Sequence, residues 1–419
     1  MLYERWRHIS REHHREIALR EVSTGRCWSF DQLNSAADAS ADVSGPIVHP
    51  TGLSADFIFR TIAAWRLGAV LCPLETGHSP PPPTALPPNI AHLKLTSATT
   101  GHARLVAFTA AQLAADAANI VSTMGLRPEW PNIAVISMAH SYGFSNLVLP
   151  LLLHGIPLIL LDSALPESLR RAVTESGNVT LPAVPALWRA WHEADALRPG
   201  ILLAISAGAP LSLALERDVH AKAGIKIHNF YGATECGGIA YDRTTQPRTD
   251  DACIGAALDG VALSLGATGC LEVRGPAVGA TYWPEPSDNL GAGCFRTADL
   301  AELTNGVVLL RGRAGEQINV AGRKVSPETI ERELLANSDV RDCLVFGVPG
   351  ADAGRGDLIV ACVVPRAGKD PGALKQFLLS RLPAWQVPKE WRFVESLEPN
   401  QRGKLSRAQW RVRLGYAAS

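Results

Sequence analysis

The middle of the chain alternates short apolar runs with amphipathic segments. In one such segment Leu169 and Val173 share a helical face, and the pattern ends near Gly177. Continuous apolar runs that alternate with helices are typical of a parallel sheet covered on both faces. We therefore predict strands at five apolar runs, which lie at residues 133–136, 156–161, 179–181, 201–205 and 225–227.

Two changes of pattern follow towards the C-terminus. Short strands punctuated by glycine and proline replace the helices from about residue 253 to 311, which predicts a β-rich subdomain. Further on, Ser326 precedes a proline and a glutamate, a combination that predicts a helix start with a hydroxyl cap. The predicted fold class is α/β, with a large N-terminal body of mostly parallel sheets flanked by helices over 1–312 and a small α+β domain over 313–419.

The composition narrows the class of protein. Forty basic residues balance forty acidic residues, which argues against a nucleic-acid protein and against a polybasic membrane-surface binder. The chain is 47% hydrophobic and 19% charged, so it can bury a sizeable core. Its most apolar stretch, residues 147–161, is interrupted by prolines and is short for a membrane span. The eight cysteines form no Cys-x-x-Cys pair, and a reducing, cytoplasmic setting fits them best.

Three loops carry residues suited to nucleotide chemistry. Residues 96–101 are small or carry hydroxyls and could turn N–H and O–H groups toward a polyphosphate, although the Walker-type Gly-Lys-Ser/Thr is missing. Residues 206–211 and 229–235 each end a predicted parallel strand, where open α/β sheets place their ligands. In the last loop an aromatic ring could stack on a base, and a carboxylate could hold Mg²⁺. Taken singly, each of the three is more often an ordinary turn or loop.

Six segments, taken in order, resemble the motifs of the adenylate-forming superfamily, which contains acyl-CoA synthetases and the adenylation domains of peptide synthetases. The resemblance covers most of the chain and implies a C-terminal lid domain that swings between two positions and carries a catalytic lysine. The segments lie at residues 96–101, 139–144, 231–235, 295–300, 312–318 and 400–407.

By this resemblance, a nucleotide lies across the ends of the main sheet. Tyr231 would stack on the adenine, and Asp299 and Arg313 would hold the ribose. The other residues implied to bind the nucleotide are Thr96, Ser97, Thr99, Thr100, Gly101, Arg104, Gly208, Ala209, Pro210, Asn229, Phe230 and Gly232.

The resemblance also implies the groups that act on the reacting atoms. Thr234 would contact the α-phosphate, Glu235 would hold Mg²⁺, and Lys404 would reach the reacting carboxylate and the α-phosphate. A carboxylate that attacks an α-phosphate brings two anions together, so cationic and hydrogen-bonding groups must be fixed around the phosphorus. A lysine ammonium suits this task because it is a compact point charge.

The acyl group and the thiol are assigned by the same resemblance. Gly315 would lie at the hinge of the lid, and Gly322 would leave room for the pantetheine of coenzyme A. His140 would act as a further catalytic residue at the carboxylate, although a core histidine bonded to a backbone carbonyl is the alternative. The acyl pocket would be lined by His140, Tyr142, Gly237 and Gly238.

Two features depart from the family pattern. The loop at 96–101 has Ala98 where the family has glycine, and Ala103-Arg104-Leu105 replaces the usual Pro-Lys-Gly. The region before this loop is also short, so we expect one or more strands of the first subdomain to be missing.

The sequence as a whole predicts an ATP-dependent acid:CoA ligase that forms an acyl-adenylate and then a thioester. Its cofactors would be ATP, Mg²⁺ and coenzyme A, and its partner would be a small-molecule carboxylic acid, without nucleic acid or a membrane span. Two alternatives stay open. One is an enzyme that loads the phosphopantetheine of a carrier protein, and the other is a degenerate nucleotide-binding homologue without turnover.

Overall fold

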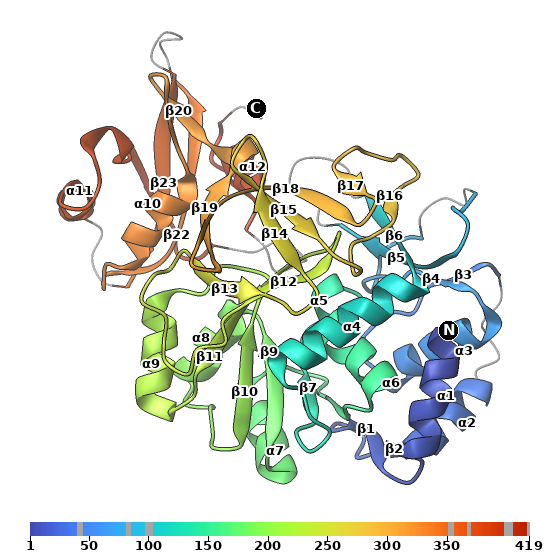
Figure 1. The fold of residues 1–419 in the computed structure, drawn as a ribbon. Coiled ribbons are helices and arrows are strands. Elements are labelled where there is room, and N and C mark those ends of the chain that lie inside the picture. Colours follow the sequence, from blue (N-terminus) through green and yellow to red (C-terminus); the bar gives the residue numbers. More distant parts are fainter. Residues whose placement is uncertain are drawn as a thin grey trace.

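The computed structural model describes residues 1–39, 45–80, 85–96, 104–350, 356–366, 370–397 and 405–416. Most of the chain forms a broad body, and its C-terminal elements stand at one side of that body (Figure 1). The body contains a long mixed sheet and a smaller second sheet, both flanked by helices. This arrangement confirms the predicted fold class.

The parallel half of the main sheet contains a strand at each of the five predicted runs, but the last, predicted at 225–227, begins at Ile227 and continues to Ala233. Its strand order is β11-β10-β9-β7-β8-β1, and the short antiparallel β2 completes the edge. The bounds are β1 (Ile17–Glu21), β2 (Cys27–Ser29), β7 (Asn132–Ala134), β8 (Leu158–Leu160), β9 (Val179–Ala183), β10 (Ile201–Ser206) and β11 (Ile227–Ala233). The helices around these strands are α4 (Ala110–Met124), α5 (Ser141–Gly143), the π-helical turn η1 (Phe144–Val148), α6 (Leu149–His154), α7 (Pro166–Ser176), α8 (Pro185–Glu193) and α9 (Leu213–Ala223).

The same sheet continues beyond β11 as antiparallel strands. Residue Asn229 is the last on β11 to pair with the parallel β10, and from Phe230 onward the strand pairs with β12. These strands confirm the predicted β-rich region. They are β12 (Gly237–Tyr241), β13 (Cys253–Ala257), β14 (Ala262–Leu265), β15 (Cys270–Arg274), β17 (Leu290–Gly291), β18 (Cys294–Thr304) and β19 (Val307–Arg313).

The second sheet lies beside the first and contains the strand that ends before Thr96 and the strand that begins after Arg104. Its order is β16-β6-β5-β4-β3. The strands are β3 (Ile47–Val48), β4 (Val70–Leu71), β5 (Ile90–Leu95), β6 (Leu105–Thr109) and β16 (Thr281–Trp283), and the N-terminal helices are α1 (Leu2–Glu12), α2 (Phe30–Ala39) and α3 (Ala55–Leu67). Helix α4 begins at a capping box formed by Thr109 and Gln112, which satisfies two backbone N–H groups at its start.

The C-terminal part has its own core around a three-stranded sheet. The sheet packs against α10 through Ile330, Leu334 and Val345. Ser326 is the N-cap residue of α10, but its hydroxyl bonds the Glu328 side chain and not a backbone N–H, so the predicted cap hydrogen bond is wrong. The elements are β20 (Ile318–Val320), β21 (Arg323–Val325), α10 (Pro327–Leu335), β22 (Val340–Pro349), β23 (Asp357–Pro365), α11 (Pro371–Leu379), β24 (Glu390–Phe393) and α12 (Arg407–Arg413), with 3₁₀ turns η2 (Ala314–Glu316) and η4 (Ala384–Gln386).

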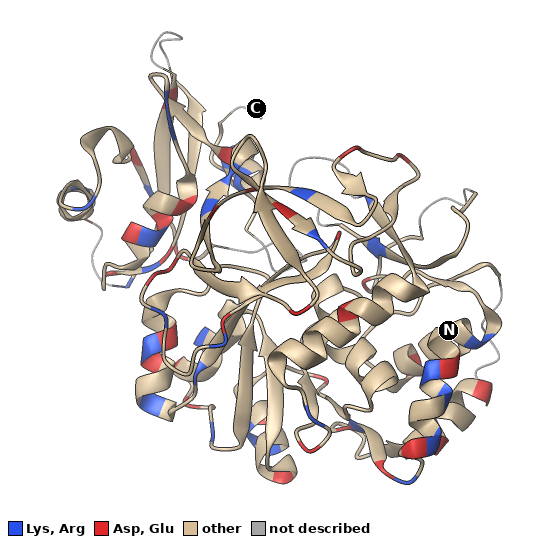
Figure 2. Ribbon diagram, in the orientation of Figure 1, with Lys and Arg blue, Asp and Glu red and all other residues tan. Residues whose placement is uncertain are grey.

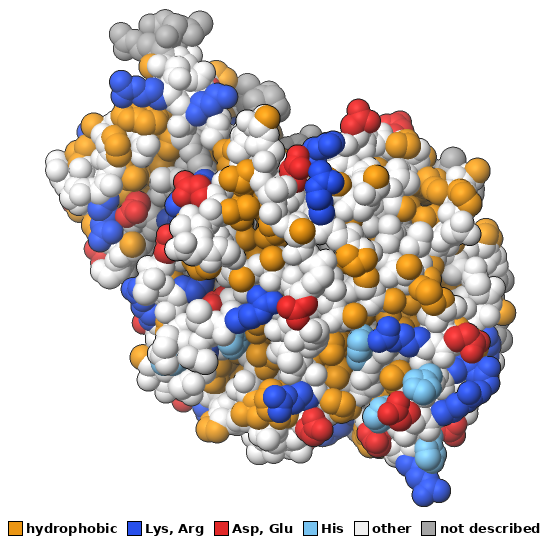
Figure 3. All heavy atoms as spheres, in the orientation of Figure 1, with side chains coloured by type: hydrophobic (Ala, Val, Ile, Leu, Met, Phe, Trp, Pro, Cys, Tyr) orange, Lys and Arg blue, Asp and Glu red, His pale blue; other side chains and the backbone are white. Residues whose placement is uncertain are grey.

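Acidic and basic residues are interspersed along the surface helices, as α1, α9 and α10 show (Figure 2). On the face drawn in Figure 3, charges of both signs alternate with scattered hydrophobic atoms. None of the helices in the described part of the chain has the length and apolar character that crossing a bilayer requires.

The side chain of Arg407, the first residue of α12, links this last helix to η2 and α10. Its guanidinium forms ion pairs with Glu316 on η2 and with Glu328 and Glu331 on α10. Its Nε also donates to the Val345 carbonyl at 2.9 Å. Burial raises the pKa of the Glu331 carboxyl, and the positive charge of Arg407 opposes that shift.

We expect Arg407→Met to lower the free energy of unfolding by about 3 kcal/mol, because a buried carboxylate loses its partner. Urea unfolding followed by tryptophan fluorescence measures this. Arg366→Met, at an exposed arginine of the same region, is the control and should change stability by less than about 0.5 kcal/mol. Equal effects of the two changes would show that the Arg407 ion pairs do not stabilise this region.

Candidate active site

Tyr231, Asp299 and Arg313 meet where the parallel part of the main sheet gives way to the antiparallel part. Asp299 and Arg313 are directly opposite one another on β18 and β19. One Asp299 oxygen accepts a hydrogen bond from the Tyr231 hydroxyl at 2.5 Å, and the other accepts from the Arg313 Nε at 2.9 Å. Burial raises the pKa of the Tyr231 phenol well above its usual value, and the Asp299 charge adds to this. Tyr231 therefore stays a neutral hydrogen-bond donor.

The loop after β10 is exposed at Gly208, Ala209 and Pro210, so its backbone is accessible to a ligand. Gly208 has a φ of +87°, which favours glycine. The side chains of two other predicted nucleotide-binding residues contact groups of the protein. The Asn229 amide donates to the Cys253 carbonyl at 3.4 Å, and the buried Phe230 ring packs 5.9 Å from the Tyr142 ring.

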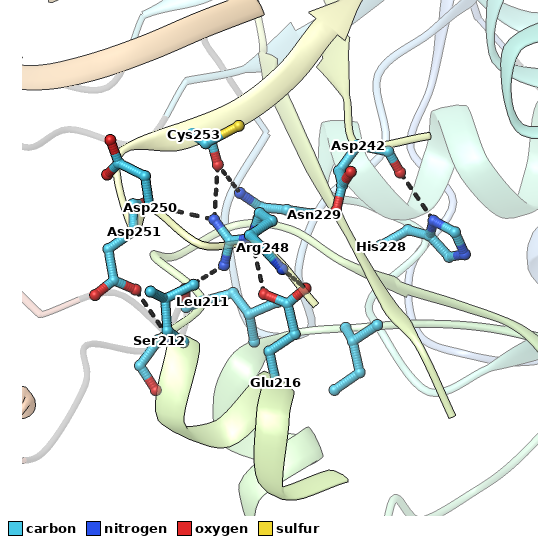
Figure 4. Close-up of polar contacts among 12 residues, drawn as sticks. Leu211, Ser212, Glu216, His228, Asn229, Asp242, Arg248, Asp250, Asp251 and Cys253 are labelled. Atoms are coloured by element: carbon cyan, nitrogen blue, oxygen red, sulfur yellow. Dashed lines mark hydrogen bonds and ion pairs between the residues drawn. The ribbon is translucent and has the colours of Figure 1, made fainter. Parts of the chain in front are cut away.

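Arg248 holds the base of this loop (Figure 4). Its guanidinium donates to the Leu211 carbonyl at 2.6 Å and to the Cys253 carbonyl at 2.7 Å. Its Nε donates to the Glu216 carboxylate at 2.8 Å. Because Arg248 is only 4% exposed and Glu216 is fully buried, this pair ties the loop and α9 to β13 within the core. No local pattern in the sequence indicated Arg248, because the Glu216 and Leu211 partners lie 32 and 37 residues away.

Thr234 and Glu235 occupy the turn between β11 and β12. The Tyr282 hydroxyl donates to a Glu235 carboxylate oxygen at 2.9 Å. The Arg104 guanidinium stacks over the Tyr282 ring at 3.6 Å and donates to the Glu285 carbonyl at 3.2 Å. The turn that carries Glu235 therefore lies next to the strand that follows the predicted phosphate loop.

His140 is paired with a carboxylate that the sequence analysis missed. Glu75, a few residues after β4, lies 3.3 Å from the His140 Nε2 and accepts a hydrogen bond from the Ser137 hydroxyl at 2.5 Å. Both side chains are about one-third exposed. Tyr142 differs, since its hydroxyl lies 3.4 Å from the backbone carbonyls of both Ala183 and Ile205.

Gly237 and Gly238 are glycines because neighbouring side chains press against them. A Cβ on Gly237, which has a φ of +70°, would lie 2.0 Å from an Asp116 carboxylate oxygen. A Cβ on Gly238 would lie 2.4 Å from Leu258 and 3.1 Å from Phe230. Packing against α4 and the core thus accounts for both residues, whether or not they also line an acyl pocket.

The glycines assigned to the hinge and the thiol channel occupy open positions. A Cβ on Gly315, in η2, would meet no described atom within 4 Å. The same holds for Gly322, whose φ of +83° follows the +51° of Ala321 in the tight β20–β21 turn. This turn geometry alone is sufficient to require glycine at 322.

The residues predicted for the phosphate loop and the catalytic lysine lie mostly outside the described part of the chain. Thr96 is described at the end of β5, where its hydroxyl accepts a hydrogen bond from the Arg104 N–H at 3.0 Å. Outside the described residues lie Ser97, Thr99, Thr100, Gly101 and Lys404. Their assigned roles stay predictions.

Comparisons with known proteins identify the family. A family model for the AMP-binding enzyme matches residues 14–283, and one for the AMP-binding enzyme C-terminal domain matches 329–404. The chain therefore belongs to the AMP-binding enzyme family, which confirms the resemblance drawn from the sequence motifs.

Two relatives with assigned names are 30% identical to the chain. One is the 2,3-dihydroxybenzoate-AMP ligase of Bacillus subtilis, over 80% of this chain and 66% of that protein. The other is a probable 2-succinylbenzoate–CoA ligase of Mycobacterium tuberculosis, over 76% of this chain and 83% of that protein. The chain thus spans about two thirds of the length of the first.

Solved structures share the fold. The ATP-bound MatB of Rhodopseudomonas palustris superposes with a TM-score of 0.84 at 22% identity, over 99% of both chains. The Bacillus subtilis o-succinylbenzoate CoA synthetase in complex with ATP and magnesium gives 0.81 at 19% identity, over 97% of this chain and 98% of that one. At these identities the likeness shows the fold alone.

A double-mutant cycle tests the hydrogen bond at the centre of the site. We expect Tyr231→Phe and Asp299→Ala to be coupled by about 1.5 kcal/mol in the free energy of unfolding, because the acceptor is ionised. The control cycle pairs Tyr231→Phe with Glu302→Ala, at an exposed carboxylate of the same strand, and should be additive within about 0.3 kcal/mol. Additivity in both cycles would contradict the Tyr231–Asp299 contact.

Proposed function

We propose that the protein is an ATP-dependent acid:CoA ligase that works through an acyl-adenylate. The observation that carries the proposal is the Tyr231–Asp299–Arg313 cluster beside the exposed loop at 208–210. An aromatic ring, a carboxylate suited to ribose hydroxyls and an open backbone edge form a site for a nucleoside. Membership of the AMP-binding enzyme family supports this assignment.

In the first half-reaction a carboxylate oxygen of the acid attacks the α-phosphorus of ATP. A bond forms between that oxygen and the phosphorus, and the bond to the β-phosphate oxygen breaks, so pyrophosphate leaves. Lys404 would place its ammonium beside the two anions, and Thr234 would donate a hydrogen bond to the α-phosphate. Removing one such charge costs roughly 3 kcal/mol, or about 10²-fold in rate.

The residues present fit a magnesium ion at this site. Mg²⁺ usually binds one or two carboxylates together with substrate phosphates and water, and Glu235 lies in the turn next to Thr234. Among the described residues no three His, Cys, Asp or Glu side chains form a metal cluster. When bound, the ion would neutralise phosphate charge, and Tyr282 holds the Glu235 carboxylate in position.

In the second half-reaction a thiol attacks the acyl carbonyl carbon. The carbon–sulfur bond forms, the bond from carbon to the phosphate oxygen breaks, and AMP leaves with that oxygen. We propose that residues 313–419 move between the two steps, taking Lys404 away and admitting the pantetheine near Gly322. The acceptor is coenzyme A in this proposal, and a carrier-protein phosphopantetheine is the alternative.

Pyrophosphate release with ATP and a panel of alkyl and aryl carboxylic acids tests the function. We expect release that depends on both the acid and Mg²⁺, and thioester formation when coenzyme A is added. Lys404→Ala, which lacks the proposed catalytic ammonium, is the negative control and should lower the rate of pyrophosphate release at least 10²-fold.

Two results would overturn parts of the proposal. Absence of release with every acid, despite ATP binding, would favour the degenerate homologue. Thioester formation on a holo-carrier protein but not on coenzyme A would favour the alternative acceptor.

A further inference from the structure

A buried ion pair lies beneath the candidate active site. Lys94 on β5 is 3% exposed and Asp116 on α4 is 1% exposed. The Lys94 ammonium lies 3.4 Å from the Asp116 Oδ2 and donates to the Ser145 hydroxyl oxygen at 3.0 Å. The Ser145 hydroxyl in turn donates to the same Asp116 oxygen at 2.6 Å. The Lys94 ammonium also lies 4.7 Å from the centre of the Phe108 ring.

The other carboxylate oxygen of Asp116 reaches the main sheet. It accepts a hydrogen bond from the Gly238 backbone N–H at 3.2 Å. The adjacent Gly237 presses so closely on this oxygen that a Cβ there would lie 2.0 Å away. Because these glycines begin β12, they also end the turn that carries Thr234 and Glu235.

Four segments therefore meet at this pair, and each continues directly into a part of the candidate site. Lys94 lies on β5, two residues before Thr96. Ser145 lies on η1, one turn after His140, and Gly238 follows the Glu235 turn. Asp116 lies on α4, which begins directly after β6.

Stability alone does not account for the pair. Burying two charges costs desolvation energy that their attraction only partly offsets, and apolar residues of similar volume are often as stable or more stable. Asp116 also satisfies the Gly238 N–H and the Ser145 hydroxyl, which a leucine could not. The contacts of this residue are thus with the segments that carry the site.

We propose that Lys94 and Asp116 are positioning residues, and that their pair holds the Glu235 turn in register with the end of β5 and the His140 segment. This inference rests on the proposed function. An in-line attack is sensitive to the relative placement of these segments, because a shift of about 1 Å can cost about 10²-fold in rate. The essential contact is the hydrogen bond that the Gly238 N–H donates to the Asp116 carboxylate.

Two double variants isolate that acceptor. In Lys94→Met/Asp116→Asn the amide oxygen can still accept from the Gly238 N–H, and the amide NH₂ can donate to Ser145. In Lys94→Met/Asp116→Leu both partners are lost, while the leucine keeps the branched shape of the aspartate at a somewhat larger volume. We expect the asparagine variant to keep kcat for acid-dependent pyrophosphate release within about threefold, and the leucine variant to lose at least tenfold. Thermal midpoints of both variants should stay close to that of the unmodified protein.

A surface pair provides the control. Lys222 and Asp195 form an exposed ion pair at 2.9 Å, and Lys222→Met/Asp195→Leu should leave kcat unchanged. If the Lys94→Met/Asp116→Leu protein does not fold, Gly237→Ala replaces it, because the added Cβ would push the turn away from Asp116 and should also lower kcat at least tenfold.

The outcomes separate the two proposals. A folded leucine variant with the kcat of the unmodified protein would overturn the positioning role, as would an unchanged kcat in Gly237→Ala. Equal losses in the asparagine and leucine variants would overturn the role of the Gly238 N–H. Failure of the unmodified protein with every acid would instead count against the proposed function.

Discussion

The carboxylate of Asp299 is the constraint on which the candidate site depends. It joins Tyr231, at the end of the parallel strands, to Arg313, the last residue of the antiparallel strands. Without it, a phenol and a guanidinium would lie at this junction with no acceptor between them. The ion pair between Asp299 and Arg313 also fixes the point at which the chain leaves the body, because η2 follows Arg313 directly.

Buried polar groups elsewhere in the body act in a comparable way. Arg248 ties the loop at 208–210 to α9 and β13, and Asp116 ties the Glu235 turn to α4. In each case a charged side chain spans segments that are distant in sequence, and at least one of its hydrogen bonds is with a backbone group. Such contacts hold a loop in place without occupying the space that a ligand would use.

The fold was largely predictable from the chain. The apolar runs at 133–136, 179–181 and 201–205 became β7, β9 and β10 because buried parallel strands need continuous apolar residues. The segment at 231–235 stood out because an aromatic residue, a glycine and a carboxylate are concentrated there.

The polar scaffold was not predictable from the chain. Glu75, Lys94, Asp116 and Arg248 carry no local pattern, since each finds its partners only through tertiary folding. The reason for Gly237 and Gly238 was also hidden. Their conformation and the contacts with Asp116, Leu258 and Phe230 are properties of packing between α4, β12 and the core.

The central claim is that an oxygen of the substrate carboxylate bonds to the α-phosphorus. Mass spectrometry of AMP after turnover with an acid labelled with ¹⁸O in its carboxylate tests it most directly. The account predicts that one labelled oxygen moves from the acid to AMP when the thiol displaces it. AMP without the label, or ADP as the nucleotide product, would contradict it.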